Sequence, residues 1–516
     1  MIRPVPRERV LVEIQCLLSS HRETVTLRLE AYLHEEDFET MTYSEMKCEN
    51  VVRKVWALCH ILRGDGVSYH QYVTELTYLL FLKIAEENQV EQLLPSGCRW
   101  NDLIKHQDDD LLEFYQMTLT QLGKSARSET IRSIYTFPTT VFSHSENLRA
   151  VIDGIDDIAW NDIDGDRFGE IYEGLVEKIS QDVRSGAGQY FTPRAVVNSI
   201  VRVMKPTIGE LIQDPAVGSG GFLVAADRYV RSNNSATDYS QDPPKYQGVE
   251  IEKNTRRICL MNTFLNELDA DVIYGDALTD DGKALTQADL ILANPPFGSK
   301  AGSRRDPRDD LPYPTANKQL LFLQHIYSNL SKNGRAAVVL PDSVLFDAGV
   351  GRLIRQDLLK KCKLHTILRL PTGIFSSAGV KTVVLFFNSR RGKSDQEIWF
   401  YDLRTNMPSF GKKNVITAKH FEEFEKLYGD DPFGSTMREE HGESGRWRKL
   451  TRQKITERGD NLDWTWLRDE NGDHEDDMTD PDEIAAAIMG HLRAALDEIE
   501  ALTEELEVAP EPEAAE

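Results

Sequence analysis

The chain has 516 residues, of which 40% are hydrophobic and 28% charged, and this length and composition indicate a globular protein with two or three domains. Its formal net charge is −24, but the segment from Asn461 to the end holds 19 acidic residues and only two arginines, a net charge of −17. The first 460 residues therefore carry a net charge of −7. This charge neither supports nor excludes binding to nucleic acid. The sequence has no signal peptide and no stretch long enough to span a membrane, so we expect a cytoplasmic protein. The six cysteines form no CxxC pair, so we expect neither a zinc site nor a disulfide framework.

The first part of the chain is predicted to be helical. Residues 1–45 form a polar N-terminal extension to which we assign no role. Over 46–160, apolar residues recur at intervals of three and four, as in VVRKVWALCHIL from Val51 and YVTELTYLLFLKIAEE from Tyr72, and the sequence RGDG separates these two segments. This spacing predicts an α-helical N-terminal domain.

The next part, residues 161–460, alternates short β-branched runs with helix-length segments. The runs are LIQD near 211, YQGVE near 246, DVIYGDA near 271, ADLILANPP near 288, GRAAVVLP near 334, LHTILRLP near 364 and KTVVLFFN near 381. Strands separated by helices predict an α/β domain with a largely parallel, doubly wound, Rossmann-like sheet. Such sheets bind ligands beyond the carboxyl ends of their strands, and the unusual residues of this chain fall at those ends.

The last part, residues 461–516, contains an acidic low-complexity linker, DENGDHEDDMTDPDE, and a C-terminal helical segment. Apolar residues recur at roughly heptad spacing from Ile484 to Leu502. This stripe is suited to pairing with a helix of another subunit, and docking on the chain itself is an equally good interpretation.

A glycine-rich turn, DPAVGSGGF, follows the first predicted strand and begins at Asp214. Its glycines allow the backbone to turn tightly and to approach a ligand before a helix begins at about Phe222. The pattern departs from GxGxxG, which makes a dinucleotide the weaker interpretation, and a plain strand–helix turn would not require three glycines. The turn therefore indicates a cofactor-binding loop.

Acidic residues stand at the next two strand ends. Glu250 in YQGVEIE can accept hydrogen bonds from both hydroxyls of a ribose, although a strand-end carboxylate taken alone is more often solvated. Its separation from Asp214 exceeds the usual ~20 residues, and the polar insertion SNNSATDYSQDPPK accounts for the excess. Asp276 in YGDAL is suited to accepting from the exocyclic amine of an adenine in the cofactor, and a helix N-cap is a nearly equal interpretation.

The fourth strand is followed by NPPFG, in which Asn294 and Pro295 carry two candidate acceptors. The N6 of adenine is a poor nucleophile because its lone pair is delocalised into the ring. The side-chain carbonyl of Asn294 and the main-chain carbonyl of Pro295 can each accept one N6 hydrogen and so free the lone pair, while the two prolines fix φ near −65°. Phe297 offers a ring on which a flipped base can stack. Alone the sequence NPPF can be a loop, but at a strand end after a glycine-rich turn it predicts an active site.

Upstream, GAGQYFTPRAVV precedes the cofactor loop. Thr192 and Pro193 form a good N-cap and first-turn pair for the helix RAVVNSIVRVM. The N-terminus of that helix can hold the methionine carboxylate of a cofactor, with Tyr190 and Phe191 packed beside it. A capped helix without a ligand is the alternative, and the position just before the cofactor loop favours binding.

In this order the motifs GQYFTPR, DPAVGSGGF, GVE and NPPFG resemble those of gamma-class amino-methyltransferases, most closely the modification subunits of type I restriction–modification systems. WALCHILRG…YLLFLK resembles the N-terminal helical domain of that family and LPTGIFSSAGVKTVVLFF its later sheet segment, so the resemblance covers roughly residues 50–505. It implies catalysis by the NPPF tetrad, Asn294, Pro295, Pro296 and Phe297, with Phe375 on the other face of the base. The candidate cofactor-binding residues are Gln189, Tyr190, Phe191, Thr192, Pro193, Arg194, Asp214, Ser219, Gly220, Gly221, Glu250 and Asp276.

The resemblance also implies an activity and partners. The activity is transfer of a methyl group from S-adenosyl-L-methionine to N6 of a flipped adenine in double-stranded DNA, without a metal. The implied partners are a specificity subunit, which binds two modification copies and selects the DNA sequence, and a restriction subunit. Two features agree with this: the first 460 residues are acidic, and no target-recognition domain is evident after the sheet. The alternatives are methylation of cytosine N4 or of a protein glutamine, and a non-catalytic assembly subunit, against which the intact NPPF argues.

Overall fold

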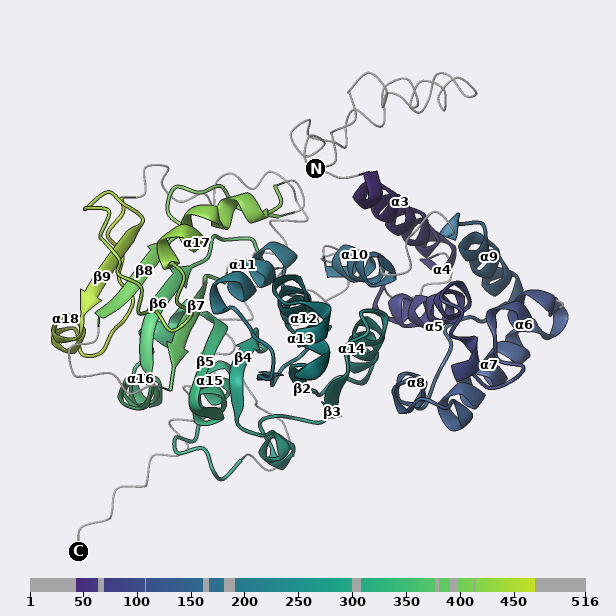
Figure 1. Ribbon diagram of the computed structural model, residues 1–516, viewed down its shortest axis with the longest axis horizontal. Coiled ribbons are helices and arrows are strands. Elements are labelled where there is room, and N and C mark those ends of the chain that lie inside the picture. The colour runs from purple at the N-terminus through teal and green to yellow at the C-terminus, as the bar shows by residue number, and fades with distance from the viewer. Residues whose placement is uncertain are drawn as a thin grey trace, which may run out of the picture.

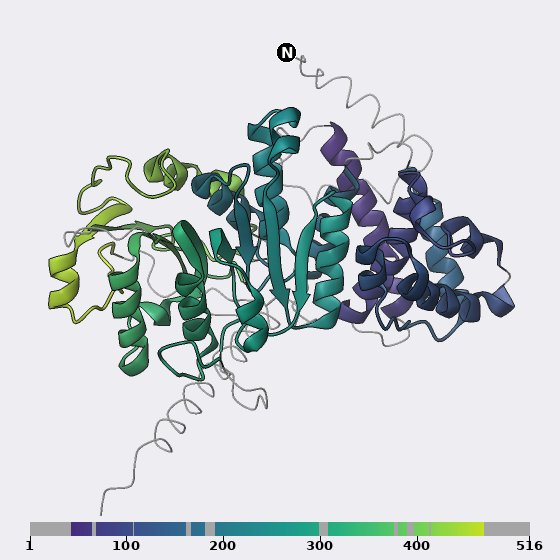
Figure 2. The same ribbon diagram turned by 60° about the horizontal axis from the view of Figure 1, so that its bottom comes forward.

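The computed structural model describes residues 43–63, 69–106, 108–160, 167–180, 191–298, 308–375, 380–389, 397–411 and 414–468. A group of helices from the first part of the chain lies beside a large sheet that carries helices on both faces (Figure 1 and Figure 2). Most of the N-terminal extension, the residues Gln189 and Tyr190, and the acidic tail from residue 469 lie outside the described residues.

The N-terminal part is helical, as its apolar spacing predicts. Its helices are α3 (Tyr43–Ala57), α4 (Cys59–Arg63), α5 (Tyr69–Glu87), α6 (Trp100–Lys105), α7 (Asp108–Ser125), α8 (Glu129–Ile134) and α9 (Ser145–Asp156), with one 3₁₀ turn, η1 (Glu91–Leu93). The second half of α5 is buried on all sides because it packs against α4, α6, α9 and two later helices, which explains its nearly continuous apolar sequence. Even so, no helix in the described ranges combines the length and the apolar character needed to cross a membrane.

The second part is built on one nine-stranded sheet. Its strands are β1 (Leu211–Asp214), β2 (Lys245–Glu250), β3 (Ala270–Tyr274), β4 (Ala288–Ala293), β5 (Leu330–Pro341), β6 (Lys363–Arg369), β7 (Thr382–Asn388), β8 (Glu397–Asp402) and β9 (Trp447–Thr451). The order is β3-β2-β1-β4-β5-β7-β6-β8-β9, in which the first five strands are parallel, β7 is antiparallel to both neighbours, and β9 is antiparallel to β8. All seven predicted strands and the Rossmann-like α/β class are confirmed.

Helices cover both faces of the sheet. The helices of this second part are α10 (Phe168–Ser180), α11 (Arg194–Met204), α12 (Gly221–Asn233), α13 (Ala236–Gln241), α14 (Lys253–Leu265), α15 (Lys318–Ser328), α16 (Gly349–Lys361), α17 (Glu422–Tyr428) and α18 (Arg452–Glu457), with 3₁₀ turns η6 (Asp280–Ala284), η7 (Asp342–Leu345) and η8 (Ala418–Phe421). Of these, α11, α12, α14, α15 and α16 pack on the central strands. Because side chains alternate along a strand, Leu290 and Leu292 of β4 join the core under α11, α12 and α14, while Ile291 and Ala293 join the core under α15 and α16. A central strand buried on both faces is the reason why β4 reads as a continuous apolar run.

The strands β8 and β9 were not predicted. β8 has only a four-residue apolar run, IWFY, and β9 (WRKLT) places basic residues between its apolar ones. Their pairing with β6 and with each other stabilises them in strand conformation at the sheet edge.

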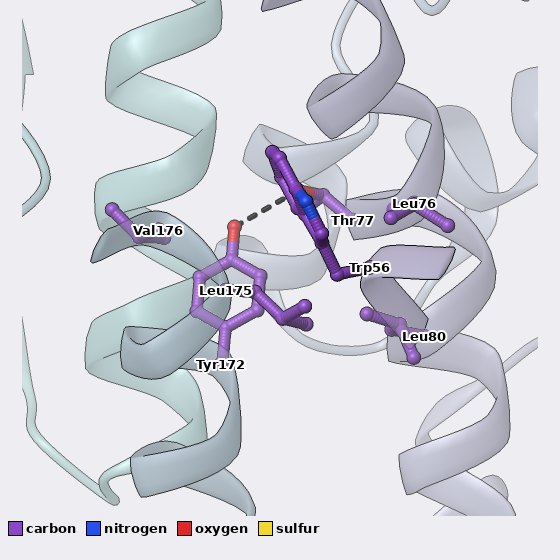
Figure 3. A pocket seen from close by; sticks show the side chains of 7 residues that line it. All are labelled: Trp56, Leu76, Thr77, Leu80, Tyr172, Leu175 and Val176. Carbon is purple, nitrogen blue, oxygen red and sulfur yellow. Dashed lines mark hydrogen bonds between the residues drawn. The ribbon is translucent and has the colours of Figure 1, made fainter. Parts of the chain in front are cut away.

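Helix α10 joins the two parts of the molecule. Figure 3 shows Tyr172 and Leu175 of α10 on the side of the helix that faces Trp56 of α3 and Leu80 of α5. The Tyr172 hydroxyl lies 2.9 Å from Thr77 Oγ1. The cavity between these side chains is only ≈ 10 Å³, which leaves no room for a ligand larger than about one water. α10 is therefore packed tightly against the helical part, and it also contacts α14 beside the sheet.

Candidate active site

The predicted site residues gather at the carboxyl ends of β2, β1 and β4, which are neighbours in the sheet. Asp214 at the end of β1 pairs with Gly248 of β2, two residues before Glu250, and the Val217 amide donates to the carbonyl of Val249 at 3.0 Å. The glycine-rich loop after β1 therefore lies directly beside Glu250. The loop containing Asn294 follows β4 on the other side of β1.

The glycine-rich loop has the tight shape that its sequence predicts. Gly218 and Gly220 adopt φ values of 54° and 82°, a conformation that L side chains rarely adopt, and a Cβ on Gly220 would lie 3.0 Å from Cys259 Sγ. At Gly221, by contrast, φ is ordinary and a Cβ would meet no described heavy atom within 4 Å. Protein packing thus explains the glycine at 220, while the open space at 221 is suited to close approach by a ligand.

Two buried carboxylates stand beside this loop. Glu250 is 5% exposed, and its carboxylate accepts hydrogen bonds from the amides of Gly218 (3.0 Å) and Glu252 (2.7 Å). Burial raises the pKa of Glu250 to about 7. Asp214 is also buried and accepts from the Ala216 amide at 3.0 Å, and burial, reinforced by the Glu250 charge, raises its pKa to about 8. Backbone donors thus orient the Glu250 carboxylate beside the glycine-rich loop.

Asp276 follows β3 and is 8% exposed. Its Oδ1 accepts from the Leu278 amide at 2.9 Å, and its carbonyl accepts from the Thr279 amide at 2.9 Å, so the residue closes a turn. The next helical element begins only at Asp280, with Thr279 as N-cap. The interpretation of Asp276 as a helix N-cap is therefore wrong, because the chain turns once before the 3₁₀ helix begins.

The NPPF loop holds Asn294 in a defined orientation. The Asn294 side-chain amide donates to Thr192 Oγ1 at 2.9 Å, and its Oδ1 is buried and has no hydrogen-bond partner among the residues that the structure describes. Pro295 is buried and Phe297 half-buried. The loop ends at Gly298, whose amide donates to Gln319 Oε1 at 3.0 Å and whose carbonyl accepts from the Lys318 amide at 2.8 Å, which fixes the loop to the start of α15.

The segment before α11 differs from the prediction. The helix begins at Arg194 with Pro193 as its N-cap, so the predicted N-cap role of Thr192 is wrong. The physical reason is the contact with Asn294, which engages the Thr192 hydroxyl while the Pro193 carbonyl accepts the first helical bonds from Val196 and Val197. The guanidinium of Arg194 lies 3.5–3.6 Å from carboxylate oxygens of α10 rather than standing free.

The two remaining aromatic candidates, Phe191 and Phe375, are packed in or against the core. Phe191 is half-buried against the core under α11. Phe375, after β6, is 8% exposed and belongs to that same core. Within the described ranges no cluster of histidine, cysteine and carboxylate side chains could hold a metal ion.

One residue of the site was missed by the motifs. Asn262 of α14 is 1% exposed and donates from its side chain to the carbonyl of Ser219 in the glycine-rich loop, at 3.0 Å. The available signal was a stripe of small and polar side chains on one face of a helix, Cys259, Asn262, Thr263 and Asn266, at the spacing i, i+3, i+4 and i+7.

Comparisons with known proteins agree with this geometry. Residues 163–475 match the family model described as N-6 DNA Methylase, and residues 51–155 match the model of the HsdM N-terminal domain. The chain is 41% identical over 518 residues to the StySPI type I restriction enzyme methylase subunit of Salmonella potsdam, covering 91% of this chain and 97% of that protein. Among solved structures, the EcoKI M protein shares 38% identity with a TM-score of 0.51, covering 90% of this chain and 98% of that one. A protein from a structural study of complex assembly and conformational transition in a type I restriction–modification system shares 28% identity, with a TM-score of 0.66 and coverage of 90% and 99%.

The matches extend over both parts of the molecule, the helical part and the sheet with its carboxyl-edge loops. The chain therefore belongs to the N-6 DNA methylase family, among the methylase subunits of type I restriction enzymes.

Proposed function

We propose that this chain methylates N6 of adenine in double-stranded DNA, with Asn294 and Pro295 holding the reacting amine. The observation that carries the proposal is the Asn294 side chain. Its amide nitrogen is engaged by Thr192, so its Oδ1 faces away from that bond, buried and without a partner among the described residues. An unpaired buried acceptor is costly in a folded protein, and an incoming amine hydrogen would satisfy it.

The NPPF loop can hold an amine because its two acceptors are rigidly placed. Asn294 Oδ1 and the Pro295 carbonyl each accept one N6 hydrogen, which draws the nitrogen towards sp³ geometry and frees its lone pair. Pro295 and Pro296 fix φ, and the anchoring of Gly298 to α15 stops the loop from moving away. Phe297, half-buried at the end of the loop, is the ring on which a flipped base stacks.

The residues beside the glycine-rich loop suit S-adenosyl-L-methionine. This cofactor supplies a methyl group bound to a sulfonium sulfur. Gly221 leaves open space where any side chain would obstruct a ligand, and Glu250 offers a carboxylate whose remaining lone pairs can accept from ribose hydroxyls. Asp276 and the segment Phe191–Arg194 line the neighbouring walls in this proposal, together with Gln189 and Tyr190, which lie outside the described residues.

The proposal includes partners. We infer that a specificity subunit selects the DNA sequence and binds two copies of this chain, and that a restriction subunit can join them in the cytoplasm. Support comes from the family and from charge, because a body with net charge −7 over its first 460 residues is poorly suited to neutralise many phosphates alone.

The experiment is product analysis with a methyl-labelled cofactor. The chain is combined with its specificity subunit and unmodified DNA, and the DNA is digested to nucleosides. Label in N6-methyl-2′-deoxyadenosine is the expected result, and DNA already methylated at the same sites serves as control. Label in cytosine or in protein would select one of the alternative amine substrates, and the absence of any label would favour an assembly subunit without catalysis.

A further inference from the structure

The glycine-rich loop is fixed by two side chains from different elements. Glu250 of β2 accepts from the Gly218 amide, and Asn262 of α14 donates to the Ser219 carbonyl at 3.0 Å. With Gly218 and Gly220 both in the left-handed region, the loop has little intrinsic preference for one shape, so these external bonds determine its conformation. Asn262 is nearly inaccessible to solvent, which makes water a poor substitute for its bond.

The direction of the Asn262 amide is set by a chain of hydrogen bonds. Arg228 of α12 donates from Nη2 to Asn266 Oδ1 at 2.6 Å, and an arginine can only donate. The Asn266 nitrogen therefore faces Asn262, where it donates to Oδ1 at 3.1 Å and to the main-chain carbonyl at 2.8 Å. With its oxygen so engaged, Asn262 must present its nitrogen to Ser219.

The same chain ends on α10. Arg228 Nη1 lies 2.9 Å from Glu173 Oε2, and Arg194, the first residue of α11, lies 3.6 Å from the same oxygen. The glycine-rich loop and the start of α11, two walls of the proposed cofactor pocket, are thus connected through one carboxylate. α10 in turn packs against α3 and α5 of the helical part (Figure 3).

α10 makes room for these hydrogen-bonded side chains at one glycine, Gly169. A Cβ on Gly169 would lie 2.5 Å from Asn266 Oδ1, so the helix can approach Asn266 only because residue 169 has no side chain. Gly174, on the same helix, approaches a different partner: its Cβ would lie 2.9 Å from Val52 Cγ2 in α3. A substitution at Gly169 therefore disturbs the hydrogen-bonded side chains, whereas a substitution at Gly174 disturbs the apolar packing of α10 on α3.

We propose that Asn262 is a positioning residue for the cofactor loop, and that Asn266, Arg228 of α12 and Glu173 of α10 hold it in place. The affinity for S-adenosyl-L-methionine then depends on how closely α10 approaches Asn266 at Gly169. This inference rests on the proposed function, since it assigns the loop to that cofactor. Asn262 itself does not touch the reacting atoms.

The test measures cofactor binding to the full chain by calorimetry without DNA, together with the melting temperature of each variant. Asn262→Leu removes the donor at similar volume, and we expect the Kd for S-adenosyl-L-methionine to rise about tenfold. Gly169→Ala should raise it about threefold by displacing Asn266. Gly174→Ala, the matched control, should lower the melting temperature to a similar degree and leave the Kd unchanged.

Kinetics in the complex with the specificity subunit separate positioning from general damage. In Asn262→Leu the KM for the cofactor should rise while kcat at saturating cofactor stays within about twofold, because the reacting groups are untouched. Wild-type Kd in Asn262→Leu, or equal losses of affinity in the Gly169 and Gly174 variants, would overturn the inference. If Asn262→Leu does not fold, the two glycine variants decide. A wild-type chain that fails to bind the cofactor would instead refute the proposed function.

Discussion

Glu75 in the helical part and Glu250 at the carboxyl edge of the sheet are both buried glutamates, and burial raises the pKa of each to about 7. Their surroundings differ. Glu75 Oε1 accepts from the hydroxyls of Tyr115 (2.6 Å) and Thr140 (3.0 Å), and its Oε2 accepts from the Val141 amide (2.9 Å). Glu250 accepts from two backbone amides that belong to the loops of the proposed pocket.

The difference shows that a raised pKa does not by itself mark a functional site. The donors to Glu75 come from α7 and from the irregular segment between α8 and α9, so this carboxylate connects separate segments of the helical part. The donors to Glu250 shape a loop that borders open space at Gly221. We therefore expect substitutions in the helical part to change stability, and substitutions at the sheet edge to change activity or cofactor affinity.

The largest expected effect is at the sheet edge. Asn294→Ala removes one of the two proposed acceptors, and we expect methyl transfer to fall about 10²- to 10³-fold, as when one donor of an oxyanion hole is lost. Cofactor affinity and melting temperature should stay close to wild type. Asn234→Ala, at the C-cap of α12, is the control and should retain full activity. Unchanged turnover in Asn294→Ala, measured in the reconstituted complex, would show that the active site lies elsewhere.

In the helical part, Glu75→Gln should alter the pH dependence of stability. The folded-state pKa of Glu75 is about 7 against an ordinary value of 4.5, so the folded protein holds this proton more tightly and stability is lost as pH rises from about 4.5 through 7. The neutral glutamine should remove a penalty of about 3 kcal/mol at pH 8 and change little at pH 4.5. Chemical denaturation at both pH values measures this. A variant less stable than wild type at pH 8 would contradict it.

At the sheet edge the pH dependence should have the opposite sign. We expect the affinity for S-adenosyl-L-methionine to be full above pH 7 and to fall as Glu250 gains its proton, because the ionised carboxylate is the stronger acceptor for ribose hydroxyls. Glu250→Gln should weaken binding about 20-fold at pH 8 and flatten the profile. Binding isotherms from pH 6 to 8 for both forms provide the measurement. A wild-type affinity independent of pH would show that Glu250 does not bind the cofactor.

The smallest expected effect distinguishes ligand space from protein packing. Gly221→Ala meets no described atom within 4 Å, so the melting temperature should not fall, while the added methyl group should weaken cofactor binding about fivefold by occupying ligand space. Gly411→Ala is a matched control, since its Cβ also meets no described atom and its φ is ordinary. Equal cofactor affinity in the two variants would place the ligand elsewhere.

Much of the fold could be predicted because its signals are local. The apolar spacing of α5, the runs of β1 to β7 and the start of α12 all follow from neighbouring residues, and the structure confirms them. The predictions that failed depended on distant partners. Thr192 was expected to cap α11, but it bonds to a side chain 102 residues away, and β9 is a strand because β8 lies beside it.

The sequence by itself determined the elements, the order of the strand-end motifs and the types of chemical group at each, because backbone preferences and residue chemistry are properties of short segments. Only the tertiary structure decided how those groups are oriented. The bond from Asn294 to Thr192, the support of Ser219 by Asn262 and the chain from there to α10 all join segments far apart in sequence. The sheet brings them together, since neighbouring parallel strands place their carboxyl ends along one edge.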